Sequence, residues 1–257
     1  MSTTSRKLIL ITNDDSISAP GIHRLVDAVG EQADVYVVAP AQPHSGQSAA
    51  ITVGAPLHIQ ELENYNNARR YAVTGTPVDC VKLALNAILP RTPDLILAGI
   101  NHGSNSAVNV TYSGTMGAVL EGCMLGIPSV GFSLLDHSMR ADFSLSLPLV
   151  ADIISDVLNH GLNTGTCLNI NIPADITPKG ARVCRAARGR WTDEYEHYTD
   201  PCGRPFYWLK GTFISSEPQA TDTDDYWLEQ GFISIVPVTP DQTIPGEIAP
   251  LSLRFDR

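Results

Sequence analysis

Apolar residues in this chain form short unbroken runs that alternate with segments in which they recur at helical spacing. The first run, from Leu8 to Ile11, contains no polar side chain. A strand without a polar face is typical of a parallel sheet that is covered on both sides. Further runs that are mostly apolar occupy residues 34–39, 95–100, 127–133 and 166–172. The pattern therefore predicts a sheet of buried strands.

The segments between these runs carry apolar residues three or four positions apart, as expected for helices with one buried face. The predicted helices cover residues 22–29, 80–89, 116–125 and 143–159. Strands and helices alternate in this way up to about Pro173. This alternation predicts an α/β fold with a doubly wound, mostly parallel, Rossmann-like sheet and right-handed crossovers.

Two regions depart from the alternation. We expect a β excursion at residues 51–59 and 70–73, interrupted by a polar loop at 61–69. Beyond Pro173, antiparallel strands are expected at 182–190 and 206–213, around a polar loop with aromatic residues. A further strand is expected at 231–238. We interpret residues 1–257 as a single domain, with an α/β core (1–175) and a β-rich carboxyl-terminal extension with a β-hairpin (176–257).

Composition narrows the class of protein. Hydrophobic residues make up 43% of the chain, enough for a large core, and the net charge of −10 argues against stable nucleic-acid binding. The five cysteines are odd in number, widely spaced and without a Cys-x-x-Cys pair, which favours reduced thiols. Neither a signal-peptide pattern nor an apolar run of membrane-spanning length is found, so we expect a cytoplasmic protein without membrane association.

Polar loops follow three of the buried strands, at residues 13–15, 42–48 and 101–105. The carboxyl ends of parallel strands meet at one edge of a sheet, where ligands bind. Carboxylate, hydroxyl and amide oxygens suit Mg²⁺, Mn²⁺ or Ca²⁺, although His44 and His102 leave a softer metal open. Taken alone, Asp14 and Asp15 favour a turn or a helix cap over a ligand site. The three loops together indicate a metal site.

Ser113, Gly114 and Thr115 stand at the start of a predicted helix. Free backbone amides and the positive end of the helix dipole make such a start a phosphate cradle, although an ordinary N-cap has the same residues. An anion cradle beside a site for a hard metal ion is what hydrolysis of a phosphate ester requires.

These motifs, taken in order, resemble those of the SurE family, the survival-protein-E acid phosphatases or 5'/3'-nucleotidases. The resemblance covers nearly the whole chain. It rests on Asn13-Asp14-Asp15, Ala19-Pro20-Gly21-Ile22, Ser45-Gly46-Gln47-Ser48, Gly75-Thr76-Pro77-Val78-Asp79, Gly99 to Asn105, Tyr112 to Thr115, Glu121-Gly122, Gly126-Ile127-Pro128, Asn169 to Pro173, Thr223-Asp224 and Gly231 to Ile235.

The resemblance implies a metal-dependent phosphomonoesterase that hydrolyses nucleoside 5'- and 3'-monophosphates to nucleoside and phosphate. It also implies one divalent ion per subunit, Mg²⁺ or Mn²⁺, and a homodimer or homotetramer that exchanges parts of the extension between subunits. Carried over by motif, the metal ligands are Asp14, Asp15, Ser45 and Asn101. The residues implied for the phosphate pocket are Asn105, Ser113, Gly114 and Thr115.

One position departs from the family pattern. The family usually has Gly directly after the two aspartates, and this chain has Ser16. If the backbone there needs a positive φ, serine costs on the order of 1 kcal/mol.

Our hypothesis for the mechanism is that Asp14 and Asp15 are the catalytic carboxylates because they hold the cation. A metal-activated water attacks in line, and Ser113 with nearby amides stabilises the charge on the phosphate. The group that takes the proton of the water is open between an Asp carboxylate and His102. Two other functions fit the same residues, a non-catalytic nucleotide-binding regulator and a metal-dependent hydrolase of a sugar or amide. The carboxylates combined with an anion cradle favour the phosphatase.

Overall fold

The structure is a computed structural model that describes residues 6–138 and 140–256. The strands are β1 (Lys7–Thr12), β2 (Ala33–Pro40), β3 (Ile59–Tyr65), β4 (Ala68–Val73), β5 (Leu95–His102), β6 (Ser129–Leu134), β7 (Cys167–Ile172), β8 (Ala181–Val183), β9 (Gly189–Thr192), β10 (Tyr195–Thr199), β11 (Pro205–Leu209), β12 (Thr212–Ser215) and β13 (Ile233–Val238). The α-helices are α1 (Pro20–Val29), α2 (Pro77–Leu83), α3 (Gly114–Met124), α4 (Leu147–His160), α5 (Asp224–Glu229) and α6 (Pro245–Phe255). Two shorter helical segments are η1 (Ala84–Ile88) and η2 (Ala107–Thr111).

Within the described residues, the main sheet has nine strands in the order β3-β4-β2-β1-β5-β6-β7-β13-β8. β1 lies between β2 and β5 and runs parallel to both. β3 and β13 run antiparallel to their neighbours β4 and β7. Because β2, β1 and β5 are adjacent and parallel, the polar loops that follow them leave the sheet at the same edge.

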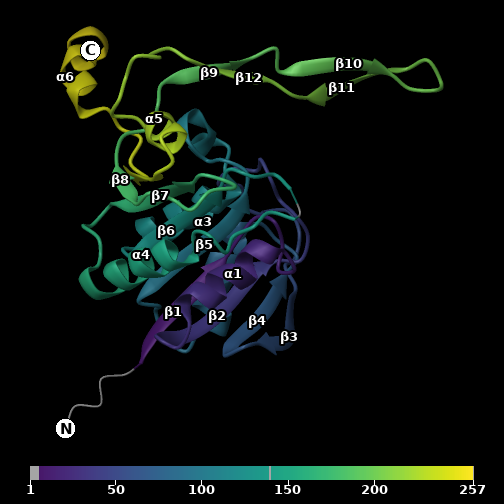
Figure 1. Ribbon diagram of the computed structural model, residues 1–257, viewed down its shortest axis with the longest axis vertical. Coiled ribbons are helices and arrows are strands. Elements are labelled where there is room, and N and C mark those ends of the chain that lie inside the picture. The colour runs from purple at the N-terminus through teal and green to yellow at the C-terminus, as the bar shows by residue number, and fades with distance from the viewer. Residues whose placement is uncertain (1–5, 139, 257) are drawn as a thin grey trace.

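Helices cover both faces of the sheet (Figure 1). Ile9 and Ile11 of β1 pack with residues of α1 and α4, whereas Leu10 packs with residues of α2 and α3. All three side chains are 0% exposed. Successive side chains of a strand point to opposite faces, so an unbroken apolar run is what a doubly covered strand needs. The predicted doubly wound α/β fold is confirmed.

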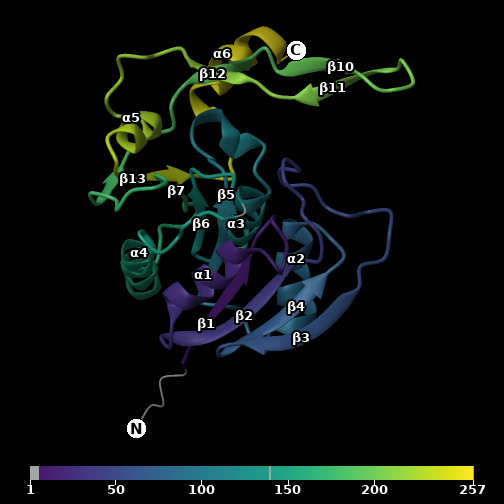
Figure 2. The same ribbon diagram turned by 45° about the vertical axis from the view of Figure 1, so that its right-hand side comes forward.

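The extension forms an arm that projects away from the sheet. β9 pairs with β12 and β10 with β11, both antiparallel, and together they make one long hairpin. Figures 1 and 2 show this arm on the same side of the molecule as α6, beyond β13 and α5. No residue of α6 is buried. The hairpin and the strand at 231–238 confirm the predicted β-rich tail. β13 and β8 join this tail to the main sheet. The division of the chain at residue 175 stays a prediction.

Several predicted elements were wrong in position or direction. β3 lies where a polar loop was expected, and residues 51–58 contain no helix or strand. Because β3 is an edge strand with mostly exposed or half-buried side chains, it lacks the alternating pattern that reveals a strand.

The other differences lie at helix starts and in the tail. α4 begins at Leu147 rather than at 143, with Pro148 in its first turn, where proline is favoured. β8 runs parallel to β13 and does not form part of the hairpin. α5 and α6 were not expected. No helix in the described part of the chain is long and apolar enough to cross a bilayer.

Candidate functional site

Asp14 follows directly after β1 and lies in the interior, with 3% of its surface exposed. The hydroxyl of Thr115 donates a hydrogen bond to Asp14 Oδ1. A Cβ atom placed on Gly114 would come within 2.8 Å of Asp14 Cβ, so a larger residue at 114 would displace Asp14. The predicted metal-binding loop and the predicted phosphate cradle at the start of α3 are therefore in direct contact.

Burial raises the pKa of Asp14 to about 6; the hydrogen bond from Thr115 opposes this effect and the charge of Asp15 adds to it. Among residues 6–138 and 140–256, no Lys or Arg pairs with either carboxylate, and the ion-pair partner of Asp15 is His102 Nδ1, at 3.1 Å. A buried carboxylate without a basic partner favours its neutral form unless a cation binds beside it. Its surroundings therefore fit a bound divalent cation.

The end of β5 lies beside Asp15. The backbone N–H of His102 donates to Asp15 Oδ2 at 2.9 Å. The side chain of Asn101 donates through Nδ2 to the carbonyl of Gly103 at 2.8 Å, and this bond leaves its Oδ1 atom for another partner. Asn101 directly precedes His102, the residue that bonds Asp15, and presents the kind of oxygen that a hard metal ion takes.

The loop after β2 is fastened at both of its ends. The N–H of His44 donates to the carbonyl of Asp14 at 2.7 Å, and the N–H of Ser48 donates to the carbonyl of Tyr112 at 3.0 Å. Ser45 lies between these two anchors, one residue after His44, and is exposed. The loop therefore spans from the aspartates to the residue that precedes Ser113.

The backbone and side chain of Asn105 are both held by buried polar groups. Its N–H donates to Asn171 Oδ1 and its Nδ2 to Ser133 Oγ, each at 2.8 Å. Its carbonyl accepts from Asn169 Nδ2 at 2.8 Å. Side chains of β6 and β7 thus hold the loop after β5 in place.

The hydroxyl of Ser113 caps α3 by accepting from the N–H of Met116 at 3.0 Å. The N–H groups of the first turn of a helix have no partner inside the helix, so those of Gly114 and Thr115 are available to an anion at the start of α3. Thr115 itself is 0% exposed, and its hydroxyl is engaged by Asp14.

The structure thus brings together the loops that carry all eight predicted site residues. In the described part of the chain, no cluster of three or more His, Cys, Asp and Glu side chains forms a metal site. The predicted ligand set does not require one, because it combines two carboxylates with a hydroxyl and an amide. The individual roles of these residues stay predictions.

Comparisons with known proteins identify the family of the chain. The family model described as survival protein SurE matches residues 9–193. The chain belongs to the SurE family. It is 45% identical to the 5'-nucleotidase SurE of Phocaeicola vulgatus, over 94% of each chain. It is 47% identical to the 5'-nucleotidase SurE of Christiangramia forsetii, over 96% of each chain.

The fold agrees as well. The crystal structure of the SurE protein from Aquifex aeolicus superposes with a TM-score of 0.81 at 34% identity, covering 96% of this chain and 98% of that chain. The sequence resemblance to the SurE family is thereby confirmed over nearly the full length.

Ser16 takes a backbone φ of 92°, in the left-handed region where the family's usual glycine has no strain. Asn13 Nδ2 donates to the carbonyl of Ser16 at 2.8 Å and holds the turn in this conformation. The condition under which serine is strained at this position, a positive φ, is therefore met.

The residues that support Asn105 were missed in the sequence. Asn169 and Asn171 are buried in β7, with 1% and 0% of their surface exposed. Their signal was present, because two asparagines alternate with isoleucines on a strand that is otherwise apolar. Buried amides need partners, so such a pattern indicates a loop that crosses the sheet edge and is held there.

Proposed function

We propose that this protein is a metal-dependent phosphomonoesterase that hydrolyses nucleoside 5'-monophosphates, and 3'-monophosphates as a second substrate, to nucleoside and phosphate. The observation that carries the proposal is the contact between the buried Asp14 carboxylate and the start of α3. This contact would join a cation site to an anion cradle, the two parts that phosphate ester hydrolysis needs. Its SurE relatives named 5'-nucleotidase support the choice of nucleotides.

Asp14, Asp15, Ser45 and Asn101 would hold one Mg²⁺ or Mn²⁺ ion. When bound, such an ion neutralises charge on a phosphate oxygen and lowers the pKa of a coordinated water. The N–H groups at the start of α3 and the Asn105 side chain would bind and orient the phosphate. A preorganised set of donors stabilises the charge of the transition state at no further cost in reorganisation.

His102 is placed to orient Asp15. Its backbone N–H and its Nδ1 atom both lie within 3.1 Å of Asp15 Oδ2, and its ring packs edge-on against Phe143. These contacts restrain the carboxylate, and His102 is a candidate for taking a proton from the attacking water.

The proposal includes a homodimer or homotetramer in the cytoplasm. The five cysteines are free thiols, the state favoured in a reducing compartment. The hairpin arm and α6 expose large apolar side chains, among them Trp208 at 67% and Leu253 at 90%. Exposed apolar surface of this kind marks a protein–protein contact, which here would be with a second copy of the chain.

The direct test is phosphate release from 5'- and 3'-nucleoside monophosphates by the purified protein, with Mg²⁺ or Mn²⁺ and with a chelator. We expect release that depends on the metal. Binding of nucleotide without release would favour the alternative of a non-catalytic regulator. Release that survives exhaustive chelation would remove the metal from the proposal.

The assignment of the metal ligand is tested by Asp14→Asn, which keeps the shape and removes the charge. We expect a loss of about 100-fold or more in kcat and a weaker apparent affinity for Mn²⁺ in calorimetry. The matched control is Asp34→Asn, an exposed carboxylate on the neighbouring strand β2 that pairs with Arg6 at the opposite end of the sheet. Full activity and full Mn²⁺ affinity in Asp14→Asn would falsify the assignment.

A further inference from the structure

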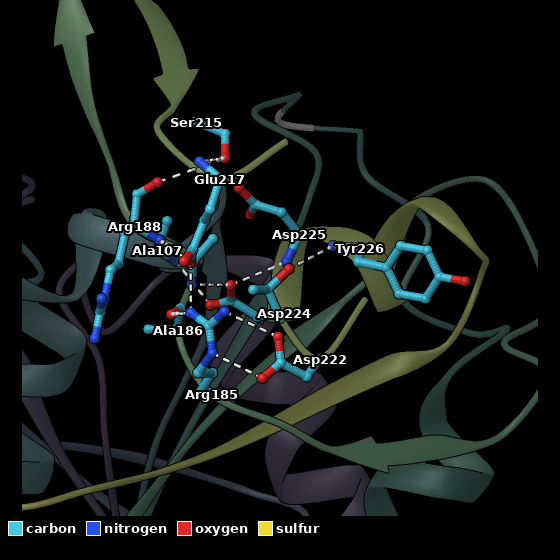
Figure 3. Close-up of polar contacts among 12 residues, drawn as sticks. Ala107, Arg185, Ala186, Arg188, Ser215, Glu217, Asp222, Asp224, Asp225 and Tyr226 are labelled. Carbon is cyan, nitrogen blue, oxygen red and sulfur yellow. Dashed lines mark hydrogen bonds and ion pairs between the residues drawn. The ribbon is translucent and has the colours of Figure 1, made fainter. Parts of the chain in front are cut away.

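Three backbone N–H groups converge on the carboxylate of Asp224, the first residue of α5 (Figure 3). Its Oδ2 atom accepts from Ala107 at 2.8 Å. Its Oδ1 atom accepts from Ala187 at 2.7 Å and from Asp225 at 2.9 Å. The side chain is 0% exposed, and the nearby Arg185 pairs with Glu217 and Asp222 instead. Asp224 therefore acts on the backbone of the segments around it.

The first of these segments carries the predicted phosphate pocket. Ala107 comes two residues after Asn105 and begins η2, which leads to Ser113. Its φ of 50° is unfavourable for a residue with a Cβ atom, by roughly 1 kcal/mol. The bond to Asp224 stabilises this conformation, in which the chain turns from the loop after β5 toward α3.

Asp225 holds the residue before Ala107. Its Oδ1 atom accepts from the hydroxyl of Ser106 at 2.9 Å. Two consecutive carboxylates at the start of α5 thus bind two consecutive residues of the loop, between Asn105 and Ser113.

The start of α5 is itself anchored to the base of the hairpin arm. Arg185 pairs with Asp222 through two bonds of 2.9 Å, and Glu217 accepts from the N–H of Arg188 at 2.9 Å. Figure 3 shows the guanidinium of Arg185 facing the carboxylate of Asp222 on the turn that precedes Asp224. Asp224 and Asp225, which together hold Ser106 and Ala107 as a clamp, are therefore attached to the base of the hairpin arm.

Resting on the proposed phosphomonoesterase function, we propose that Asp224 is a positioning residue. Its carboxylate, assisted by that of Asp225, sets the positions of Asn105 and Ser113 in the phosphate pocket by holding Ser106 and Ala107 between them. The extension then helps to position the residues of the phosphate pocket.

The chemistry of this clamp demands a carboxylate. Both oxygens of Asp224 accept from N–H groups, whereas asparagine has one acceptor oxygen and an NH₂ group. Whichever way the amide turned, its NH₂ would face a backbone N–H. Asp224→Asn is therefore an isosteric change that releases one side of the clamp.

The test compares Asp224→Asn with Asp222→Asn, a matched control in the same turn. Asp222 binds Arg185, but Glu217 still pairs with this guanidinium in Asp222→Asn, so the base is kept. None of the side-chain bonds of Asp222 reaches residues 105–111. For Asp224→Asn we expect KM for a nucleoside monophosphate, and the inhibition constant of inorganic phosphate, to rise about tenfold or more. We expect a smaller change in kcat and an unchanged Mn²⁺ requirement, because Asp14 and Asp15 do not contact Asp224. Asp222→Asn should leave the kinetic constants near those of the wild type.

Hydrogen–deuterium exchange gives a readout that does not depend on activity. Amides of residues 105–111 should exchange about tenfold faster in Asp224→Asn and at the wild-type rate in Asp222→Asn. Equal kinetic and exchange changes in the two variants would mean a merely structural role and would overturn the inference, as would wild-type behaviour of Asp224→Asn.

A second pair of variants covers the case in which Asp224→Asn does not fold. Asp225→Ala and Ser106→Ala remove the same bond from its two sides, and Ser106→Ala also removes the bond that its hydroxyl accepts from Ser104. Each should raise KM by about threefold or more, and the double variant no further than Ser106→Ala alone. Additive effects, or none, would overturn the inference.

The two proposals fail in different ways. A wild-type protein inactive on every nucleotide ends the proposed function, and the exchange rates then still decide whether Asp224 holds the loop. An active wild type with an unaltered Asp224→Asn ends only the inference.

Discussion

At the scale of single residues, the buried carboxylate of Asp14 links stability to pH. Its pKa is raised by burial from 3.8 to about 6, so the folded state binds the proton more tightly than the unfolded chain does. Stability must therefore fall as the pH rises from about 4 to about 6, and the loss is complete above the folded-state pKa. A shift of this size corresponds to at most about 3 kcal/mol.

In protein stripped of metal by a chelator, Asp14→Asn should remove this penalty. At about pH 8 we expect the free energy of unfolding of the variant to exceed that of the wild type by about 1–3 kcal/mol. This gain should vanish near pH 4. Urea titrations at a fixed protein concentration measure it. Asp34→Asn serves again as the control, and a gain that is the same at both pH values would contradict the account.

Ser16 gives a second prediction at this scale. Its φ of 92° strains a residue with a Cβ atom, so Ser16→Gly should raise the free energy of unfolding by about 1 kcal/mol. Ser18→Gly, in the same loop but without a positive φ, should give no gain, because there glycine only adds freedom to the unfolded chain. The comparison again uses urea unfolding; a gain in both variants, or in neither, would contradict the strain.

The residue scale also shows what a sequence reveals about a site. The meeting of the loops that carry Asp14, Asp15 and Asn101 could be predicted, because each loop follows a buried apolar strand and the ends of neighbouring parallel strands must meet. The pairing of Thr115 with Asp14 could not, because a hydroxyl at a helix start fits a cap, a phosphate cradle and a carboxylate partner equally well. Only the placement of α3 against β1 decides among them.

At the scale of elements, β7 supports the site although it contributes no predicted ligand. The Oδ1 atom of Asn171 accepts from the buried N–H of Asn105. Asn171→Ala would leave this N–H without a partner, which costs about 1–3 kcal/mol. We expect lower stability and a raised KM for the nucleotide. Asn163→Ala, just before the same strand and exposed, is the control, and thermal unfolding with steady-state kinetics measures both.

Helices and strands could be predicted where one face, or both faces, are buried within the chain. The strands buried on both faces and the helices with one apolar face were found within a few residues. β3 was missed because it lies at the edge of the sheet, and α6 was missed because none of its residues is buried in this chain. A hydrophobic pattern reports burial, so an element that buries nothing within its own chain has no pattern that distinguishes it from a loop.

At the scale of the whole molecule, the arm and α6 are too small to be stable alone. An isolated two-stranded hairpin is marginal in water, and so is a helix of 11 residues. Both expose apolar side chains, including Tyr207 at 64% and Phe255 at 64%. We therefore expect these elements to pack against a second copy of the chain.

The oligomer is tested by placing a charge on that surface. Trp208→Glu or Leu253→Glu should shift the protein from a dimer or tetramer to a smaller species in sedimentation velocity, because burying an unpaired carboxylate in an apolar interface costs several kcal/mol. Met124→Glu is the control, since Met124 is apolar and 60% exposed but lies on α3, outside the extension. A wild-type protein that sediments as a monomer would contradict the oligomer, and an unchanged assembly in both extension variants would place its interface elsewhere.

Because the clamp formed by Asp224 ties the phosphate loop to this same extension, a variant that loses its partner should also show a raised KM, and a fully active monomer would mean that the clamp holds without the partner.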